Sequence, residues 1–492
     1  MNPSGAELPD GDFIIDAAWV LAFQAGAPKL LRGASVRVRG DRIEEVSEEP
    51  LRGNAKRIDA RGQLLLPGLI SGHIHAAAAT PTRGIIEGGR SFGRPLMLVE
   101  GLTDEELDDL SAFNVAEILR AGCTTQVEMS LSRRQCESYV RVAKRYGVRA
   151  YPGGMIPGPA EWERVWFRTD DQALFDAEPR ILAEIEAYRR YALRENGAED
   201  RRILPMMMPH ATDTHTPETM KASLAVAREL GNGIHIHLAQ SPDEVESCKR
   251  LWGKRPVEWL DELGFFSERV FGAHLWSIDL AEDPRILAGK ETFTYAHCPS
   301  SLGAGGGNAT QPYPELLAAG VRTSIGLDTH SNDYVENMKL ALLDGQARYW
   351  LLNETSPVPM KRPTVWDVVN GATLNPARGL GRDDLGRIAP GAKADLCTID
   401  VTGFLVGVGA VPPEPLNNLL YANGLSVRHV VTDGNFQIFD GRLAVDDEER
   451  VLKRGGAVVE TIWKQLEAEG WFTPDPDFPP GWPYTWKSSE PR

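Results

Sequence analysis

The sequence predicts an α/β protein, a parallel (β/α)8 (TIM) barrel with a small β-sandwich domain built from both ends of the chain. Two observations support this fold class. Short apolar runs alternate with helical patterns over residues 67–385, and β-rich segments flank that region on both sides. An open doubly wound sheet is the alternative, but no GxGxxG follows the first run, which weakens its dinucleotide-binding form.

The flanking segments predict the small domain. In residues 12–66, apolar residues such as Val36 and Val46 alternate with polar ones around a Gly-Asp turn, which is typical of a hairpin. Residues 386–446 show the same pattern, and because chain ends often lie close together, both segments are expected in one domain. The expected division is sandwich segments at 1–66 and 386–446, the barrel at 67–385, and a helix with a Pro- and Trp-rich tail at 447–492.

The middle region predicts the barrel. Its clearest helix begins at Thr103, the expected N-cap, has Glu106 as the capping-box partner and ends at Gly122. The expected strands are residues 64–75, 124–129, 149–155, 203–210, 234–239, 270–275, 293–297 and 323–328.

Composition narrows the function classes. The chain has 492 residues, with 53 Lys and Arg against 69 Asp and Glu, and a net charge of −16. Such an acidic chain repels phosphate backbones and anionic lipid, so we expect a small-molecule substrate and neither nucleic acid nor membrane as a partner. Five cysteines without a CxxC pair, and an N-terminus without signal-peptide features, predict a cytoplasmic protein.

Polar residues follow most of the expected strands. In a parallel barrel the carboxyl ends of the strands form one rim, where active sites lie. Residues distant in sequence therefore converge on one pocket. The rim candidates are His73 and His75, His210, His235 and His237, His274, His297, and Asp328, in strand order.

His73 and His75 suggest a metal site. Side chains two apart on a strand share a face, so both imidazoles point into the barrel mouth. An HxH pair packed in a loop is the simpler interpretation when the pair is taken alone. A third histidine and an aspartate at later strand ends favour a divalent metal with one position open for water.

Aromatic residues indicate the character of the substrate. Trp162, Trp166 and Phe167 follow the third strand, and Trp276 follows His274 by two residues. An aromatic loop over a barrel mouth suits an apolar or aryl substrate and excludes water. The alternative is that the tryptophans pack a helix onto the barrel.

Four motifs, PGLISGHIHAAAATPTRG, HIHLAQSPDEVE, AHCPSS and IGLDTHSND, resemble the amidohydrolase superfamily, especially its deaminases and chlorohydrolases. The resemblance implies one divalent ion per chain (zinc, or iron, manganese or cobalt) and a homo-oligomer. It implies that Asp328 moves a proton and that His274 polarises the substrate. It places His73, His75, His237 and Asp328 as metal ligands, and His210 in the substrate pocket.

One departure from that family determines the predicted reaction. The deaminases have a glutamate three residues after the strand-5 ligand, where this chain has Gln240. Because an amide is not a general acid, ring protonation is lost. The predicted substrate is therefore an acyclic amide, urea or (thio)carbamate, as for phenylurea and molinate hydrolases.

Three alternatives stay open. In the first, Asp243 or Glu244 compensates for Gln240, and the chain is an aminohydrolase or chlorohydrolase of a purine, pyrimidine or s-triazine. In the second, the barrel is a non-catalytic subunit without metal. The third concerns His330, which is then a loop residue rather than a substrate contact. The predicted substrate contacts are His210, Gln240, His297, Trp276, His330 and Trp166.

Overall fold

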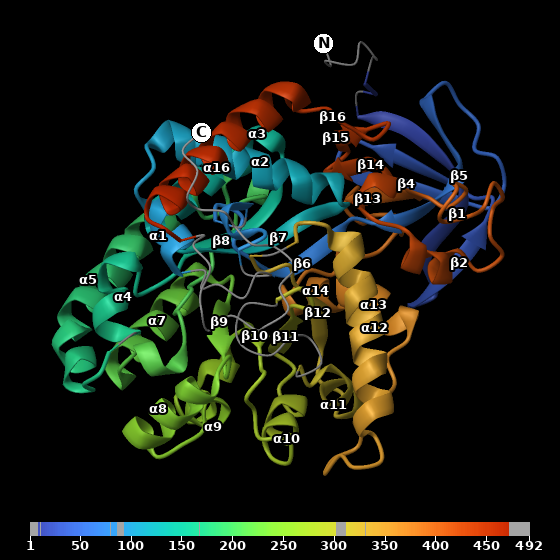
Figure 1. Ribbon diagram of the computed structural model, residues 1–492. Helices are drawn as coiled ribbons and strands as arrows, with labels where there is room; N and C mark the ends of the chain where they lie inside the picture. The colour runs from blue at the N-terminus through green and yellow to red at the C-terminus, as the bar shows by residue number, and fades with distance from the viewer. Residues whose placement is uncertain are drawn as a thin grey trace.

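The computed structural model describes residues 8–471 except 10, 79, 86–92, 167, 302–310 and 330. A barrel of parallel strands lies beside a sheet domain, and most helices surround the barrel (Figure 1). The predicted fold class is confirmed, while the division at residues 66, 385 and 446 stays a prediction.

The barrel strands form two parallel sheets, in the orders β6-β7-β8 and β12-β11-β10-β9. Isolated parallel bridges close the ring, from Ala150 to Ile203, from Met207 to Ile234, and from Ile74 to Asp328. The strands are β6 (Leu69–Ile74), β7 (Cys123–Ser130), β8 (Arg149–Gly154), β9 (Ile234–Leu238), β10 (Val270–His274), β11 (Phe293–His297) and β12 (Thr323–Ile325).

Two expected strands differ in detail. Residues 203–210 pair only through isolated bridges, because Pro205 and Pro209 have no backbone N–H for a regular ladder. The expected strand 64–75 is divided at Gly68, where a Cβ would lie 2.2 Å from the Thr124 hydroxyl oxygen. The part before Gly68 belongs to the sheet domain.

Helices form the outer layer. The capping box between Thr103 and Glu106 is present at the start of α2, as the sequence predicts. The helices are α1 (Gly93–Glu100), α2 (Asp104–Arg120), α3 (Arg133–Tyr146), α4 (Pro159–Val165), α5 (Gln172–Glu195), α6 (Ala198–Arg201), α7 (Pro217–Leu230), α8 (Pro242–Trp252), α9 (Pro256–Glu262), α10 (Asp283–Ala288), α11 (Tyr313–Ala318), α12 (Tyr334–Leu352), α13 (Val365–Ala372), α14 (Leu374–Gly379), α15 (Pro415–Asn418) and α16 (Glu448–Ala468).

The sheet domain joins both ends of the chain in one hydrogen-bonded order, β16-β15-β14-β13-β5-β1-β3-β4, with β2 paired to β1. Phe13 and Phe436 pack with ring centroids 5.0 Å apart, although three strands separate β1 from β15. The sheet therefore curls and encloses its own apolar core. Its strands are β1 (Asp12–Gln24), β2 (Ala27–Arg32), β3 (Ser35–Arg39), β4 (Arg42–Ser47), β5 (Lys56–Pro67), β13 (Leu396–Asp400), β14 (Val427–Thr432), β15 (Asn435–Phe439) and β16 (Arg442–Leu443).

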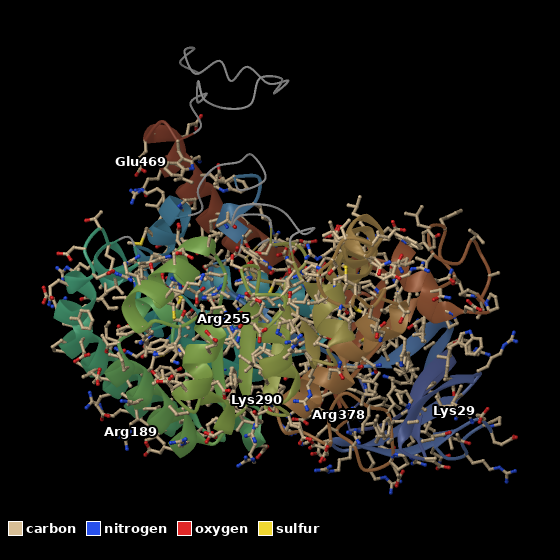
Figure 2. All side chains as sticks on the ribbon, turned by 90° about the horizontal axis from the view of Figure 1, so that it is seen from below. Lys29, Arg189, Arg255, Lys290, Arg378 and Glu469 are labelled. Carbon is tan, nitrogen blue, oxygen red and sulfur yellow. The ribbon has the colours of Figure 1, made fainter. Side chains whose placement is uncertain are left out.

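The last described helix, α16, lies across α2 (Figure 1). Gly455 permits this approach, because a Cβ there would lie 2.4 Å from the Phe113 Cβ. Trp463 donates its indole N–H to the Pro81 carbonyl. Glu469, labelled in Figure 2 at the end of α16, accepts two hydrogen bonds from Arg94. Among the described helices, none has the length and apolar character that crossing a bilayer requires.

Candidate functional site

Three imidazoles and one carboxylate meet at the barrel rim. The Asp328 Oδ1 atom lies 3.7 Å from the His73 Nε2 atom and 3.5 Å from the His75 Nε2 atom. The His75 and His237 Nε2 atoms are 3.3 Å apart. All four side chains are buried. The predicted convergence of these distant residues is thus present in the structure.

Hydrogen bonds orient the imidazoles. His235 Nδ1 contacts the Phe271 carbonyl oxygen at 2.8 Å, so this nitrogen carries the proton and Nε2 accepts. His73 Nδ1, 2.6 Å from His235 Nε2, is then the donor. His75 Nδ1 similarly donates to the Met129 carbonyl. The Nε2 lone pairs of His73 and His75 are therefore directed at the cluster, as metal ligation requires.

Burial keeps the histidines of this cluster uncharged, which is the form in which an imidazole binds a metal ion. Burial, together with the neighbouring imidazoles, holds the pKa values of His235 and His237 well below the usual range. The His73 Nε2 and His237 Nδ1 atoms are buried and have no hydrogen-bond partner among the described residues. Neutral imidazoles beside one carboxylate match the ligand chemistry of a divalent transition metal.

The rim has unusual backbone geometry. His274, Leu275 and Asp328 have φ values of 78°, 56° and 58°, in the left-handed region that non-glycine residues rarely adopt. Such conformations cost about 1–3 kcal/mol each and occur where function requires a particular side-chain direction. Gly326 adds close packing, because a Cβ there would lie 3.0 Å from the His73 Cβ.

The loop that follows Asp328 is fastened to α2. The Asn332 side-chain amide donates to Asn114 at 3.0 Å and to Glu117 at 2.9 Å. Glu117 also accepts two hydrogen bonds from Arg83, which belongs to the loop after His75. The two loops that carry Asp328 and the HxH pair are therefore held by the same helix.

A pocket of about 60 Å³ covers the cluster. His210 packs on Trp166 with ring centroids 4.4 Å apart, and Trp276 lies 4.7 Å from the His274 ring. The pocket is lined by His75, Leu96, Leu131, Met155, Trp162, Trp166, His210, His237, Gln240, His274, Trp276, Ser301, Asp328 and Thr329. An apolar, aromatic wall thus faces the polar cluster.

His210 presents a lone pair to this pocket. Its Nδ1 lies 3.2 Å from the Thr214 hydroxyl, which itself donates to the Ala211 carbonyl. Nδ1 is therefore the donor to Thr214, and the buried Nε2 is an acceptor. Burial, and then the charges of nearby histidines, lowers the pKa of His210 to about 3, so the ring is neutral at pH 7.

The structure does not bring every predicted contact to the pocket. His297 is absent from the described lining, and its ring stacks on Tyr313 at 4.4 Å. Its Nδ1 is also 3.0 Å from the Tyr295 hydroxyl. His297 thus packs between the barrel and α11, because the strand alternation directs it with Tyr295 away from the barrel interior. His330 lies outside the described residues.

Gln240 lines the pocket, and neither proposed substitute for a glutamate does so. Asp243 is exposed. The buried Glu244 carboxylate accepts from the Gln240 backbone N–H at 2.7 Å and from the Thr212 hydroxyl at 2.6 Å. Burial, together with Asp213, raises the pKa of Glu244 to about 7. Glu244 therefore supports the pocket wall and does not face the substrate space.

Two contacts in the site were not predicted. His235, a rim candidate in the sequence, orients His73, and its HxH spacing with His237 was the available signal, since both share one strand face. Ser301 donates its hydroxyl to the second carboxylate oxygen of Asp328. Nothing local in the sequence marks this serine as a partner of a residue in the next strand.

The amidohydrolase family model matches residues 64–436. The chain belongs to the amidohydrolase family. It is 30% identical over 412 residues to a 5-methylthioadenosine/S-adenosylhomocysteine deaminase of Desulfitobacterium hafniense, covering 80% of this chain and 85% of the relative. It is also 30% identical over 446 residues to a 5'-deoxyadenosine deaminase of Methanothermobacter thermautotrophicus, covering 88% and 95%.

A solved structure agrees with this amidohydrolase fold. Atrazine chlorohydrolase from Arthrobacter aurescens TC1, complexed with zinc, superposes with a TM-score of 0.74 at 21% identity, over 91% of this chain and 100% of that chain. Amidohydrolases use a divalent metal, and two overlapping groups here can hold one ion. These are His73 with His75 and His237, and His73 with His274 and Asp328, with ligand atoms within 4.8 Å of one another in each group. The chain is a metal-dependent hydrolase that acts on carbon–nitrogen bonds.

Proposed function

We propose that this amidohydrolase cleaves the carbonyl C–N bond, or C–S bond, of an acyclic amide, urea or (thio)carbamate with an apolar or aryl group. One divalent ion, zinc in our proposal, is held by His73, His75, His237 and Asp328. When bound, such an ion supplies a water activated for attack at neutral pH. The predicted cytoplasmic location and homo-oligomeric state stay predictions.

The side chains divide the remaining chemistry. Asp328 accepts the proton of the attacking water and passes it to the leaving nitrogen or sulfur. His274 hydrogen-bonds the carbonyl oxygen as negative charge develops on it, a contribution of about 3–4 kcal/mol in other enzymes. The His210 Nε2 lone pair accepts a substrate N–H, which ureas and many carbamates provide.

The residue at position 240 determines which substrate class we propose. Deamination of a ring requires a group that protonates a ring nitrogen, and hydrolysis of an acyclic carbonyl does not. Among the described residues that line the pocket, Asp328 is the one carboxylate, and Gln240 stands where the acid is needed. The hydrogen bonds of Glu244 to Gln240 and Thr212 argue against compensation from that residue.

Deamination of a nitrogen heterocycle is the second candidate. The deaminases of adenosine analogues that resemble this chain support it more directly than they support a urea or carbamate substrate. The aromatic walls formed by Trp162, Trp166 and Trp276 suit a flat ring equally well. The two candidate reactions differ in one requirement: ring deamination needs a general acid at position 240, which Gln240 cannot supply, and carbonyl hydrolysis does not.

One panel of substrates separates the candidates. Zinc-loaded enzyme is assayed for amine release from aryl ureas, carbamates and thiocarbamates, and for ammonia release from 5'-methylthioadenosine, 5'-deoxyadenosine and amino-s-triazines. We expect amine or thiol release that chelation abolishes and added zinc restores. Ammonia release with the larger kcat/KM would overturn the first proposal in favour of the second.

Variants at residue 240 sharpen the assay. We expect Gln240→Leu to keep carbonyl hydrolysis within about ten-fold, since the amide moves no proton. Gln240→Glu supplies the missing acid and is expected to admit ring deamination. A chain that binds well below one metal ion and shows neither activity after reconstitution with zinc, manganese or cobalt would instead be a non-catalytic subunit.

A further inference from the structure

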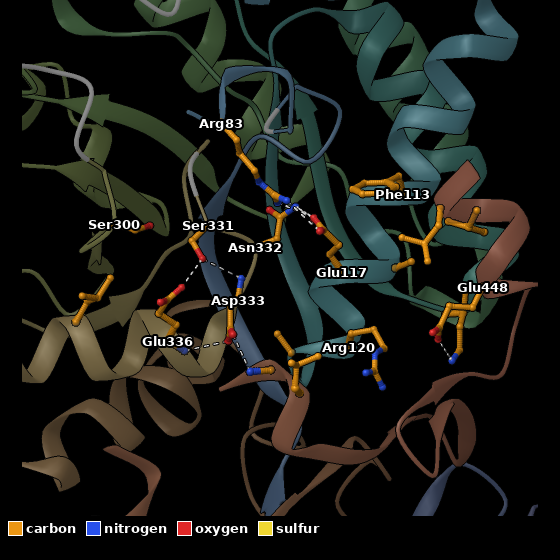
Figure 3. Close-up of a pocket in the computed structure, with 18 residues that line it drawn as sticks. Arg83, Phe113, Glu117, Arg120, Ser300, Ser331, Asn332, Asp333, Glu336 and Glu448 are labelled. Carbon is orange, nitrogen blue, oxygen red and sulfur yellow. Dashed lines mark hydrogen bonds and ion pairs between the residues drawn. The ribbon is translucent and has the colours of Figure 1, made fainter. Parts of the chain in front are cut away.

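A second, larger cavity of about 690 Å³ lies between α2, the beginning of α12 and α16 (Figure 3). No described residue lines both this cavity and the metal-site pocket. Its walls are mainly apolar, with Phe113 from α2, Leu340 from α12 and Val451 from α16. The volume is in the range of small-molecule sites, about 300–1,000 Å³.

Arg120 gives this cavity a chemical preference. Arg120 lines the cavity from α2, as Figure 3 shows, and its side chain has no ion pair among the described residues. Its Nη1 atom is the buried edge of the guanidinium, next to Gly441, so the other edge is the one available to a ligand. Burial lowers the pKa of Arg120 below its usual value; Glu448 counteracts this shift, and Arg428 and Arg442 add to it. A half-buried guanidinium without an ion pair costs free energy that an anion would recover.

The carboxylates of the lining already have partners. Glu117 accepts from Arg83 and Asn332. The other three accept within the chain: Asp333 from the Gly424 and Glu336 N–H groups, Glu336 from the Ser331 hydroxyl, and Glu448 from the Leu443 N–H. Arg83 neutralises Glu117, while the other three acids keep their charge and disfavour a ligand with two negative charges. A single negative charge is favoured only where it contacts Arg120 directly.

We propose that this cavity binds a small molecule with an apolar body and a single carboxylate, with the Arg120 guanidinium as its anchor. The carboxylate accepts hydrogen bonds from the guanidinium in a bidentate arrangement, which arginine geometry favours. The apolar body packs against Phe113, Leu340 and Val451. This site is independent of the reaction proposed above.

Calorimetric titration of the zinc-loaded enzyme with octanoate, octanol and octylammonium tests the proposal. We expect octanoate to bind best and octylammonium not to bind. Arg120→Gln should weaken octanoate binding about ten-fold or more and leave octanol binding unchanged, because a charge-assisted hydrogen bond is lost. Arg120→Lys keeps the charge and should weaken octanoate binding less.

A matched pair of variants locates the ligand. Leu340→Trp fills the cavity and should abolish octanoate binding. Leu343→Trp lies on the same helix at a position that is 47% exposed and outside the cavity, and it should leave binding unchanged. Circular dichroism establishes that each variant is folded. Octanoate binding that survives both Arg120→Gln and Leu340→Trp, or no octanoate binding to the parent enzyme at millimolar concentration, would overturn the proposal.

Discussion

The two ends of the barrel treat buried polar groups in opposite ways. At the carboxyl end of the strands, His73 and His237 have buried nitrogen atoms without described hydrogen-bond partners. At the amino end, the buried guanidinium of Arg149 contacts Asp395 at 2.8 and 3.0 Å and Asp433 at 2.5 Å. The carboxyl end therefore has imidazole nitrogen atoms available to bind a metal, and at the amino end the buried charges have oppositely charged partners.

This difference assigns the two ends different tasks. A paired buried ion cluster fixes how the sheet domain attaches to β8, and removing one partner leaves charges without solvation. The nitrogen atoms without partners and the left-handed backbone at the rim lower the stability of the fold, and the packing of the rest of the protein offsets this loss. Changes at the rim should therefore alter catalysis, and changes at the amino end should alter folding.

The largest effect is expected from Asp328→Asn. Loss of the proton acceptor should lower kcat about a thousand-fold while the melting temperature stays within a few degrees. Steady-state kinetics on metal-loaded protein and thermal unfolding measure the two quantities. Asp243→Asn, at an exposed aspartate outside the pocket, is the control. If Asp328→Asn kept kcat within ten-fold, the proton-transfer role would be lost.

Arg149→Met should produce the opposite pattern. Leaving Asp395 and Asp433 buried without their partner is expected to lower the free energy of unfolding by about 3–5 kcal/mol. Urea unfolding measures this change, and kcat per folded molecule should stay constant. Arg141→Met, which breaks a partly exposed pair with Asp108, should cost about 1 kcal/mol or less. Equal costs for both variants would remove the contrast between the two ends.

His235→Phe tests the orientation of His73. Without the acceptor for the His73 Nδ1 proton, zinc affinity should fall about 10–100-fold. Titration with a competing chelator measures it. His215→Phe removes another buried imidazole, whose partners are Ile156 and Thr219, and should leave zinc affinity unchanged. An equal loss in both variants would point to general destabilisation.

The smallest effect is expected from Asn332→Ala. Releasing the Asp328 loop from α2 should lower kcat on the order of ten-fold and change KM little, since small displacements of a reacting group slow the chemical step. Steady-state kinetics separate the two parameters. Unchanged kcat would show that the loop keeps its position without Asn114 and Glu117.

The sequence predicted the elements of the fold because their signals are local. Strand periodicity and the capping box of α2 depend on neighbouring residues, and both are present. The convergence of His73, His75, His237 and Asp328 was predictable as well, because parallel strands end at one rim.

The differences between the predictions and the structure depend on packing between segments that are distant in sequence. His297 lies on the outer face of β11 and stacks on Tyr313 of α11, and Ser301, which follows β11, donates to Asp328, which follows the neighbouring strand β12. The break at Gly68 follows from the proximity of Thr124. None of these contacts can be predicted from the sequence neighbours of the residues that make them.

The arrangement of the chain ends has a consequence for biosynthesis. β5 pairs with β13, whose strand begins at Leu396, and α16 covers α2 and the loop at Pro81. A nascent chain on the ribosome therefore completes its barrel strands while β5 and the apolar face of α2 still await their partners. Residues 396–468 protect these surfaces, so the emerging chain is most exposed to aggregation until this segment has been synthesised.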